Sequence, residues 1–267
     1  MLTYEQYYNL CKEKYYTNSK TDLYRFTYKI VNEFLENEDY NKIIENISCF
    51  LDEQYSTKRN TEESSDTPIL KFKDPWNIPE IEKLANIIIP KIEKDVYGCY
   101  ASVHGLYVYR TKPGDYKKDS SWLWHIDNHP KEILKCIVYL NEVDDLNGPF
   151  CILKDDMNRG YKHPTLRIDK DRWKKHHSRF SEQQINFILE QGYQKHNIIG
   201  KKGTSIIFDN NIVHRATLCE NKPRDVIVFM MKPNIEKTKS VICETHTGSF
   251  NCLDVYKDPE FLGIVKI

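Results

Sequence analysis

A change in the hydrophobic pattern at Tyr100 constrains the fold of this 267-residue chain more than any other feature. From there the sequence reads as short β-rich runs separated by turn-forming residues, among them Asn147-Gly148. The eight runs span residues 101–110, 122–127, 133–141, 150–153, 196–199, 204–208, 212–219 and 224–232. Many short strands divided by such turns are typical of a jelly roll, the cupin-like double-stranded β-helix.

The residues before this point favour helices that would cover the β core. One helix is predicted from apolar residues that recur at helical spacing: Leu23, Phe26, Ile30, Val31, Phe34 and Leu35. Residues 43–51 repeat the pattern, and a third helix is expected over residues 81–96 with a kink at Pro90. Residues 56–68 contain no apolar side chain and predict a loop or linker. The helices either buttress the sheet or form a partner-binding module.

The expected architecture is therefore mainly β with a helical layer, an α+β fold. Residues 1–97 are expected to form the helical N-terminal region, residues 98–233 the double-stranded β-helix core and residues 234–267 a C-terminal extension. The core carries a basic insertion at about residues 155–191, whose cations are Arg159, Lys162, Arg167, Lys170, Arg172, Lys174, Lys175 and Arg179. Ser181 and Gln184 in this insertion predict the capping box of a helix. The insertion is either a solvated surface or a lid whose cations meet an anionic substrate.

Composition excludes several classes of protein. Thirty-nine basic residues balance 39 acidic ones, whereas a dedicated nucleic-acid binder usually has a basic excess. No apolar run approaches the roughly 18 residues of a membrane-spanning helix, and the first residues lack the apolar stretch of a signal peptide. The 8 cysteines include no C-x-x-C pair, which fits reduced thiols in a cytoplasmic protein.

Three residues in the β-rich part have the chemistry of a metal site. His125 and Asp127 are two positions apart in a predicted strand, so their side chains would project from the same face. His214 lies in a later predicted strand. Two histidines and one carboxylate form the facial triad of non-haem Fe(II) oxygenases. Arg224 begins the last strand, where its planar guanidinium could pair with the carboxylate of a cosubstrate.

These segments together resemble a known family, the phytanoyl-CoA dioxygenase-like branch of Fe(II)/2-oxoglutarate-dependent oxygenases. The resemblance covers roughly residues 98–233 and rests on Trp124-His125-Ile126-Asp127, residues 137–143 with 147–150, residues 203–209 before His214-Arg215, and Pro223-Arg224. It implies iron held by the triad, 2-oxoglutarate bound through Arg224, and dioxygen as the oxidant. The presence of Asp127 favours hydroxylation, because halogenating relatives replace this ligand with a small residue. Leu153 is followed by Lys154-Asp155-Asp156-Met157 where the family often has Pro-Gly-Ser-His, which leaves the substrate open.

Further candidates surround these residues. Tyr139 and Ala216 are expected beside the cosubstrate, and His129 is a competing ligand only if the strand breaks early. Substrate contacts are expected from Arg110, Trp122, Arg172, Lys174 and Lys175. The expected function is hydroxylation of an unactivated C–H bond in a small-molecule, lipid-linked or sugar substrate that carries negative charge. The alternatives are a protein-residue hydroxylase and a non-catalytic cupin-like binding module, and the sequence leaves the oligomeric state open.

Overall fold

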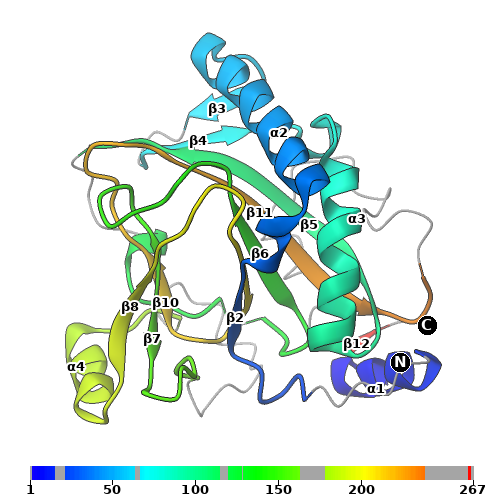
Figure 1. Cartoon of the computed structure of the whole chain (residues 1–267). Coiled ribbons are helices and arrows are strands. Elements are labelled where there is room, and N and C mark those ends of the chain that lie inside the picture. Colours follow the sequence, from blue (N-terminus) through cyan, green and yellow to red (C-terminus); the bar gives the residue numbers. More distant parts are fainter. Residues whose placement is uncertain are drawn as a thin grey trace.

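Two antiparallel sheets face each other in the computed structural model, which describes residues 2–15, 22–63, 67–114, 120–127, 129–162, 178–237 and 264–265. The large sheet has seven strands in the order β2-β9-β6-β11-β5-β4-β3, and the small sheet has three in the order β10-β7-β8. Figure 1 shows the small sheet and α4 on one side of the molecule and α2 and α3 on the other. This arrangement confirms the predicted α+β fold with a double-stranded β-helix core. Among the described residues, no helix combines the length and apolar character needed to cross a membrane.

The elements have the following bounds. The large sheet contains β2 (Tyr28–Val31), β3 (Thr61–Glu63), β4 (Ile69–Phe72), β5 (Tyr100–Thr111), β6 (Leu134–Tyr139), β9 (Ser205–Asp209) and β11 (Arg224–Asn234). The small sheet contains β7 (Phe150–Lys154), β8 (Gln194–Ile198) and β10 (His214–Ala216), while β1 (Leu2–Thr3) pairs with β12 (Ile264–Val265). The α-helices are α1 (Tyr4–Lys14), α2 (Glu38–Thr57), α3 (Ile81–Ile92) and α4 (Glu182–Glu190). Short helical turns are η1 (Glu33–Glu36), η2 (Pro75–Asn77), η3 (Glu93–Tyr97) and η4 (Ser120–Trp122).

The large sheet separates two hydrophobic cores. One face packs against α2 and α3, and alternate residues such as Val138 and Phe229 belong to that helix-side core. The opposite face carries Ile137 and Val228, which pack with Phe150 of the small sheet. Successive side chains of a strand point to opposite faces, so both faces of β6 and β11 are apolar. We call the second core, between the two sheets, the inner core.

The helix predicted over residues 23–35 is wrong. Tyr28–Val31 is a strand that extends the large sheet by pairing with β9, with Ile30 opposite Ile206. Ile30 packs against the inner core while Val31 lies in the helix-side core. Two adjacent apolar residues that must be buried on opposite sides suit a strand between two layers better than one helix face. The N-terminal region therefore supplies strands as well as helices.

Two other predictions also need correction or refinement. The expected loop over residues 56–68 contains the edge strand β3, which pairs with β4. Pro90 does not end α3, but the helix continues as the π-helical turn η3 and stops at Gly98, whose φ of 65° is left-handed. Proline removes a helical hydrogen-bond donor and crowds the preceding turn, and a π-turn is one way in which helices absorb such a change. By contrast, the capping box of Ser181 and Gln184 at the start of α4 is confirmed.

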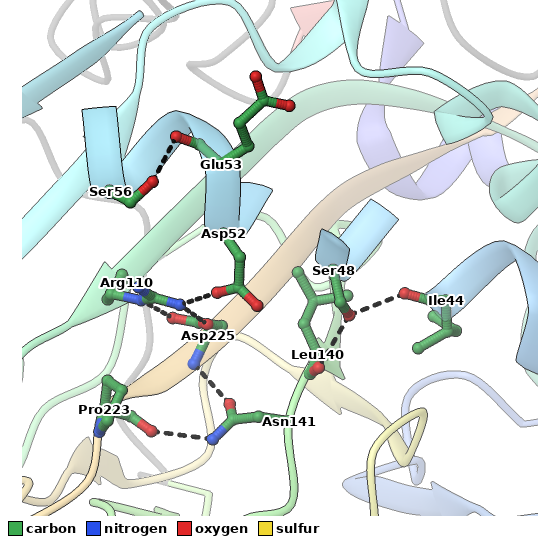
Figure 2. A network of polar contacts seen from close by, with 10 residues as sticks. All are labelled: Ile44, Ser48, Asp52, Glu53, Ser56, Arg110, Leu140, Asn141, Pro223 and Asp225. Carbon is green, nitrogen blue, oxygen red and sulfur yellow. Dashed lines mark hydrogen bonds and ion pairs between the residues drawn. The ribbon is translucent and has the colours of Figure 1, made fainter. Parts of the chain in front are cut away.

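A partly buried polar network holds the start of β11 in place (Figure 2). Arg110 donates from Nε to Asp225 Oδ1 at 2.8 Å and from Nη2 to Oδ2 at 2.6 Å. The backbone N–H of Asp225 donates to Asn141 Oδ1 at 2.8 Å, and Asn141 Nδ2 donates to the carbonyl of Pro223 at 2.8 Å. These bonds fix the backbone on both sides of Arg224.

We expect Arg110→Met to lower the free energy of unfolding by about 3 kcal/mol, because it leaves the Asp225 carboxylate buried without its partner. Asp52 also contacts Arg110, but its side chain is 65% exposed. Asp52→Asn is therefore a matched control and should cost less than about 1 kcal/mol. Urea unfolding of the wild type and both variants measures these differences, and equal losses from the two substitutions would contradict the assignment.

Candidate metal centre

His125, Asp127 and His214 converge at one point between the two sheets. Their potential ligand atoms all lie within 4.8 Å of one another. The Nε2 atom of His125 is 3.7 Å from Asp127 Oδ1, and the Nε2 atom of His214 is 3.7 Å from Asp127 Oδ2. Both histidines are 4% exposed, and the imidazole centroids are 4.2 Å apart. Two nitrogens and one carboxylate in this arrangement can hold a single metal ion.

Backbone pairing brings the two histidines together, although the strand predicted over residues 122–127 is wrong. His125 forms isolated antiparallel bridges, with His214 on one side and Arg179 on the other. The N–H of His125 donates to the carbonyl of His214 at 2.9 Å, and the reverse bond has the same length. The N–H of Asp127 donates to the carbonyl of Asn210 at 2.8 Å. Hydrogen bonds to the backbone of Asn210 and His214 therefore hold this segment in place, although it forms no regular strand.

The orientation of each imidazole is fixed by its own backbone. The Nδ1 atom of His125 lies 2.8 Å from the carbonyl oxygen of Leu123, and that of His214 lies 2.9 Å from the carbonyl oxygen of Ile212. A carbonyl oxygen can only accept a hydrogen bond, so each Nδ1 carries the proton and donates. Each Nε2 then presents its lone pair to the centre, as a metal-ligating histidine requires.

Burial and local charges favour the ligand form of all three side chains. Burial lowers the pKa of His125 well below its ordinary value, and it also lowers the pKa of His214. Burial alone would raise the pKa of Asp127, but the positive charge of Lys135 acts against it, and that pKa lies below its usual range. The Lys135 Nζ atom is 2.7 Å from Asp127 Oδ2. The centre therefore offers two neutral imidazoles and an ionised carboxylate near neutral pH, which is what metal binding needs.

Arg224 is 4% exposed and occupies the inner-core face of β11, on the same side as Val226 and Val228. Its Nη1 donates to the carbonyl of Gly148, and its Nη2 lies 3.4 Å from Thr111 Oγ1. Its buried Nε has no hydrogen-bond partner among the described residues. A buried donor without a partner calls for an additional acceptor, and a carboxylate would provide one.

Three other predicted cosubstrate and substrate residues, Tyr139, Ala216 and Trp122, lie within the described part of the chain. Tyr139 faces the inner core, but its hydroxyl donates to the carbonyl of Ile198 at 2.7 Å and accepts from the N–H of Phe150 at 3.1 Å. Ala216 lies on the same strand face as His214, two residues further along β10. The Trp122 side chain is buried.

Other expectations need correction or lie outside the described residues. Arg110 does not contact the substrate side, because it points to the helix side of β5 and pairs with Asp225. The cluster of potential ligand atoms consists of His125, Asp127 and His214 and does not include His129, whose Nδ1 lies 3.1 Å from the side-chain amide of Asn210. The substrate candidates Arg172, Lys174 and Lys175 lie outside the described residues, as do residues 238–263 and 266–267 of the C-terminal extension.

Sequence reasoning missed two cations beside the triad. Lys135 is a single cation in the otherwise apolar strand β6. Strand periodicity puts it on the same inner face as Ile137 and Tyr139, and this is the signal that could have identified it. Arg179 is one of eight cations in the basic insertion, and its backbone pairing with His125 depends on the fold and has no signal in the sequence.

Comparisons with known proteins support the fold. No protein-family model matches the sequence, and no match is found among curated proteins. The chain is similar to EctD from S. alaskensis, solved with 2-oxoglutarate and 5-hydroxyectoine, with a TM-score of 0.56 and 14% identity over 90% of this chain and 80% of that one. It is also similar to the epimerase SnoN, solved with Fe3+, alpha ketoglutarate and nogalamycin RO, with a TM-score of 0.52 and 14% identity over 85% of this chain and 84% of that one.

Without metal, the protein should lose stability as the pH falls below about 6.5, the ordinary pKa of histidine. Burial lowers the pKa of His129 to about 4 and also lowers the pKa values of His125 and His214. The unfolded chain therefore binds more protons than the folded chain in this window, so the free energy of unfolding rises with pH, on the order of 1 kcal/mol per unit for each imidazole. Urea unfolding between about pH 7 and 5 in the presence of a chelator measures the slope. His214→Gln should reduce it, and an unchanged slope would refute the assignment.

Proposed function

We propose that this protein is an Fe(II)/2-oxoglutarate-dependent oxygenase that hydroxylates a C–H bond of a small molecule. The observation that carries the proposal is the buried triad of His125, Asp127 and His214, with both Nε2 lone pairs directed at one point. Nitrogen and oxygen donors in a two-histidine, one-carboxylate set suit Fe(II) and leave coordination positions for other ligands. Bound iron would supply, with 2-oxoglutarate and dioxygen, an oxidant for C–H bonds, while the cosubstrate leaves as succinate and carbon dioxide.

Two further observations support this choice of chemistry. The motifs around the triad resemble the phytanoyl-CoA dioxygenase-like oxygenases, and the structurally similar EctD was solved with 2-oxoglutarate. The orphaned Nε of Arg224 fits the distal carboxylate of that cosubstrate. A guanidinium offers several N–H donors in one plane, so it can hold a carboxylate while it still contacts Gly148 and Thr111. The small side chain of Ala216 would leave room beside the metal.

Hydroxylation must be distinguished from other reactions supported by this fold, since the similar protein SnoN is an epimerase. Turnover with isotopically labelled dioxygen provides the test. Hydroxylation transfers one labelled oxygen atom to the substrate product and one to succinate. Epimerisation inverts a carbon centre and leaves the product without label. Screening a panel of small molecules for substrate-dependent succinate release would identify compounds for this measurement.

Removal of any triad side chain should abolish metal binding and activity. His125→Ala, Asp127→Ala and His214→Ala each delete one protein ligand, and we expect iron affinity to fall by more than about 100-fold. This exceeds the range found when only a residue behind a ligand is changed. Iron content after desalting and succinate release measure the two effects, with thermal unfolding to show that each variant is folded. A variant that keeps near-native iron content would remove that residue from the ligand set.

Substitution at Arg224 should weaken the cosubstrate selectively. Arg224→Lys keeps the charge but loses the planar fork, so the dissociation constant for 2-oxoglutarate should rise about tenfold or more while iron binding is retained. Arg215→Lys is a matched control. Arg215 projects from the face of β10 opposite to His214, and its guanidinium lies 4.6 Å from the centroid of the Trp124 ring. Calorimetric titration of the manganese-loaded proteins measures the affinity. Equal affinities in the wild type and Arg224→Lys would assign the cosubstrate carboxylate to another cation.

A further inference from the structure

Lys135 lies in an apolar row on the inner face of the large sheet. The strand register places it opposite Phe208 of β9 and Met230 of β11, and both of these side chains are buried. Directly opposed residues share a face, so the ammonium group has apolar neighbours on both sides. The Lys135 side chain is only 18% exposed, and its Nζ donates to Asp127 Oδ2 at 2.7 Å. A charge in such surroundings is costly unless it is paired, so this ion pair stabilises Lys135 beside the triad.

The ion pair cancels the charge of the one carboxylate in the triad. The imidazoles of His125 and His214 each carry their proton on Nδ1 and are neutral as ligands. The ionised Asp127 and the ammonium of Lys135 then sum to zero, so the four side chains have no net charge. A divalent metal ion would share the Asp127 carboxylate with this ammonium. Like charges repel more strongly in a buried site than in bulk water, because the effective dielectric constant is lower.

The cosubstrate would change this balance of charges. 2-Oxoglutarate has two carboxylates, which would offset the two positive charges of the metal ion. Lys135 would therefore oppose the binding of the metal ion alone, and it would oppose the binding of the metal ion together with 2-oxoglutarate much less. Such a difference is a coupling free energy, so the factor by which one component increases the affinity for the other is the same in both directions.

We propose that Lys135 makes metal retention at the triad depend on bound 2-oxoglutarate. This inference rests on the proposed function and adds a regulating residue to it. The positive charge beside Asp127 would weaken metal binding in the absence of the cosubstrate and would increase the affinity of the metal-loaded centre for the dianion. Iron would then be held tightly only when the cosubstrate is present to react with dioxygen.

Manganese can test this coupling without turnover. Electron paramagnetic resonance titration measures its dissociation constant without 2-oxoglutarate and with a saturating concentration of it, and the ratio of the two values is the coupling factor. Lys135→Met should raise the manganese affinity without cosubstrate by about tenfold or more, since one nearby charge shifts a charge-dependent equilibrium by roughly 10- to 1,000-fold. The coupling factor should fall to a similar extent. Lys135→Arg keeps the charge and should leave both values close to those of the wild type.

Lys162→Met is the matched control. Lys162 pairs with another buried carboxylate, that of Asp209, at 2.6 Å, and its side chain is 26% exposed. Asp209 is not a member of the triad, so both manganese dissociation constants should stay unchanged. Thermal unfolding shows whether each variant is folded. Lys135→Gln, which removes the charge but keeps a hydrogen-bond donor, takes the place of Lys135→Met if that variant does not fold.

The outcomes separate this inference from the proposed function. His125→Ala should abolish manganese binding. If manganese does not bind the wild type, the proposed function fails and the inference fails with it. If manganese binds but 2-oxoglutarate does not tighten it, or tightens it equally in the wild type and Lys135→Met, only the role of Lys135 is refuted. Weaker manganese binding by Lys135→Met without cosubstrate would also refute that role, since Lys135 would then only orient the Asp127 carboxylate.

Discussion

The reciprocal backbone hydrogen bonds between His125 and His214 are the interaction on which the candidate centre depends. They join two segments far apart in the sequence and set the imidazoles on one face. Carbonyl oxygens of the same segments then fix the ring orientations, through Leu123 and Ile212. The main chain thus determines most of the ligand geometry before any ion is present, which lowers the cost of organising the site when a metal binds.

The two faces of the large sheet have different roles: one lines the candidate centre and the other packs against the helices. On the inner face, β6 contributes Lys135 beside the carboxylate, and β11 contributes Arg224. On the helix side, α2 and α3 bury the alternate residues of the same strands. Strand alternation therefore lets a single layer support both the core of the protein and the surroundings of the triad.

Much of the fold was predictable because periodic patterns report local structure directly. The β-rich runs after Tyr100 and the capping box at Ser181 depend only on neighbouring residues. The structure contains the capping box and all of these runs except residues 122–127. The segment around Ile30 and Val31 was misread because a short apolar run fits a helix or a buried strand equally well. Only pairing with β9, a contact across the whole chain, decides between the two.

For the candidate site, the sequence indicates the metal ligands but not the charged residues around them. The chemistry of two histidines and a carboxylate stands out in the sequence, and the structure brings these three side chains together. The faces of Arg110 and Arg224 could not be compared from sequence, because they lie on different strands whose relative register is a tertiary property. The same limit hid Lys135, whose partner Asp127 belongs to an irregular segment rather than to a neighbouring strand.

The opposite orientations of Arg224 and Asp225 at the start of β11 affect which substitutions the protein can tolerate. Arg224 turns toward the inner core, where it contacts the carbonyl of Gly148. Asp225 turns the other way, toward Arg110 and α2 (Figure 2). Variation on the α2 side can therefore alter thermal stability while the side that faces the candidate metal centre stays constant. Engineering can use the same division, because substitutions confined to the α2 side can raise stability without altering the residues around the triad.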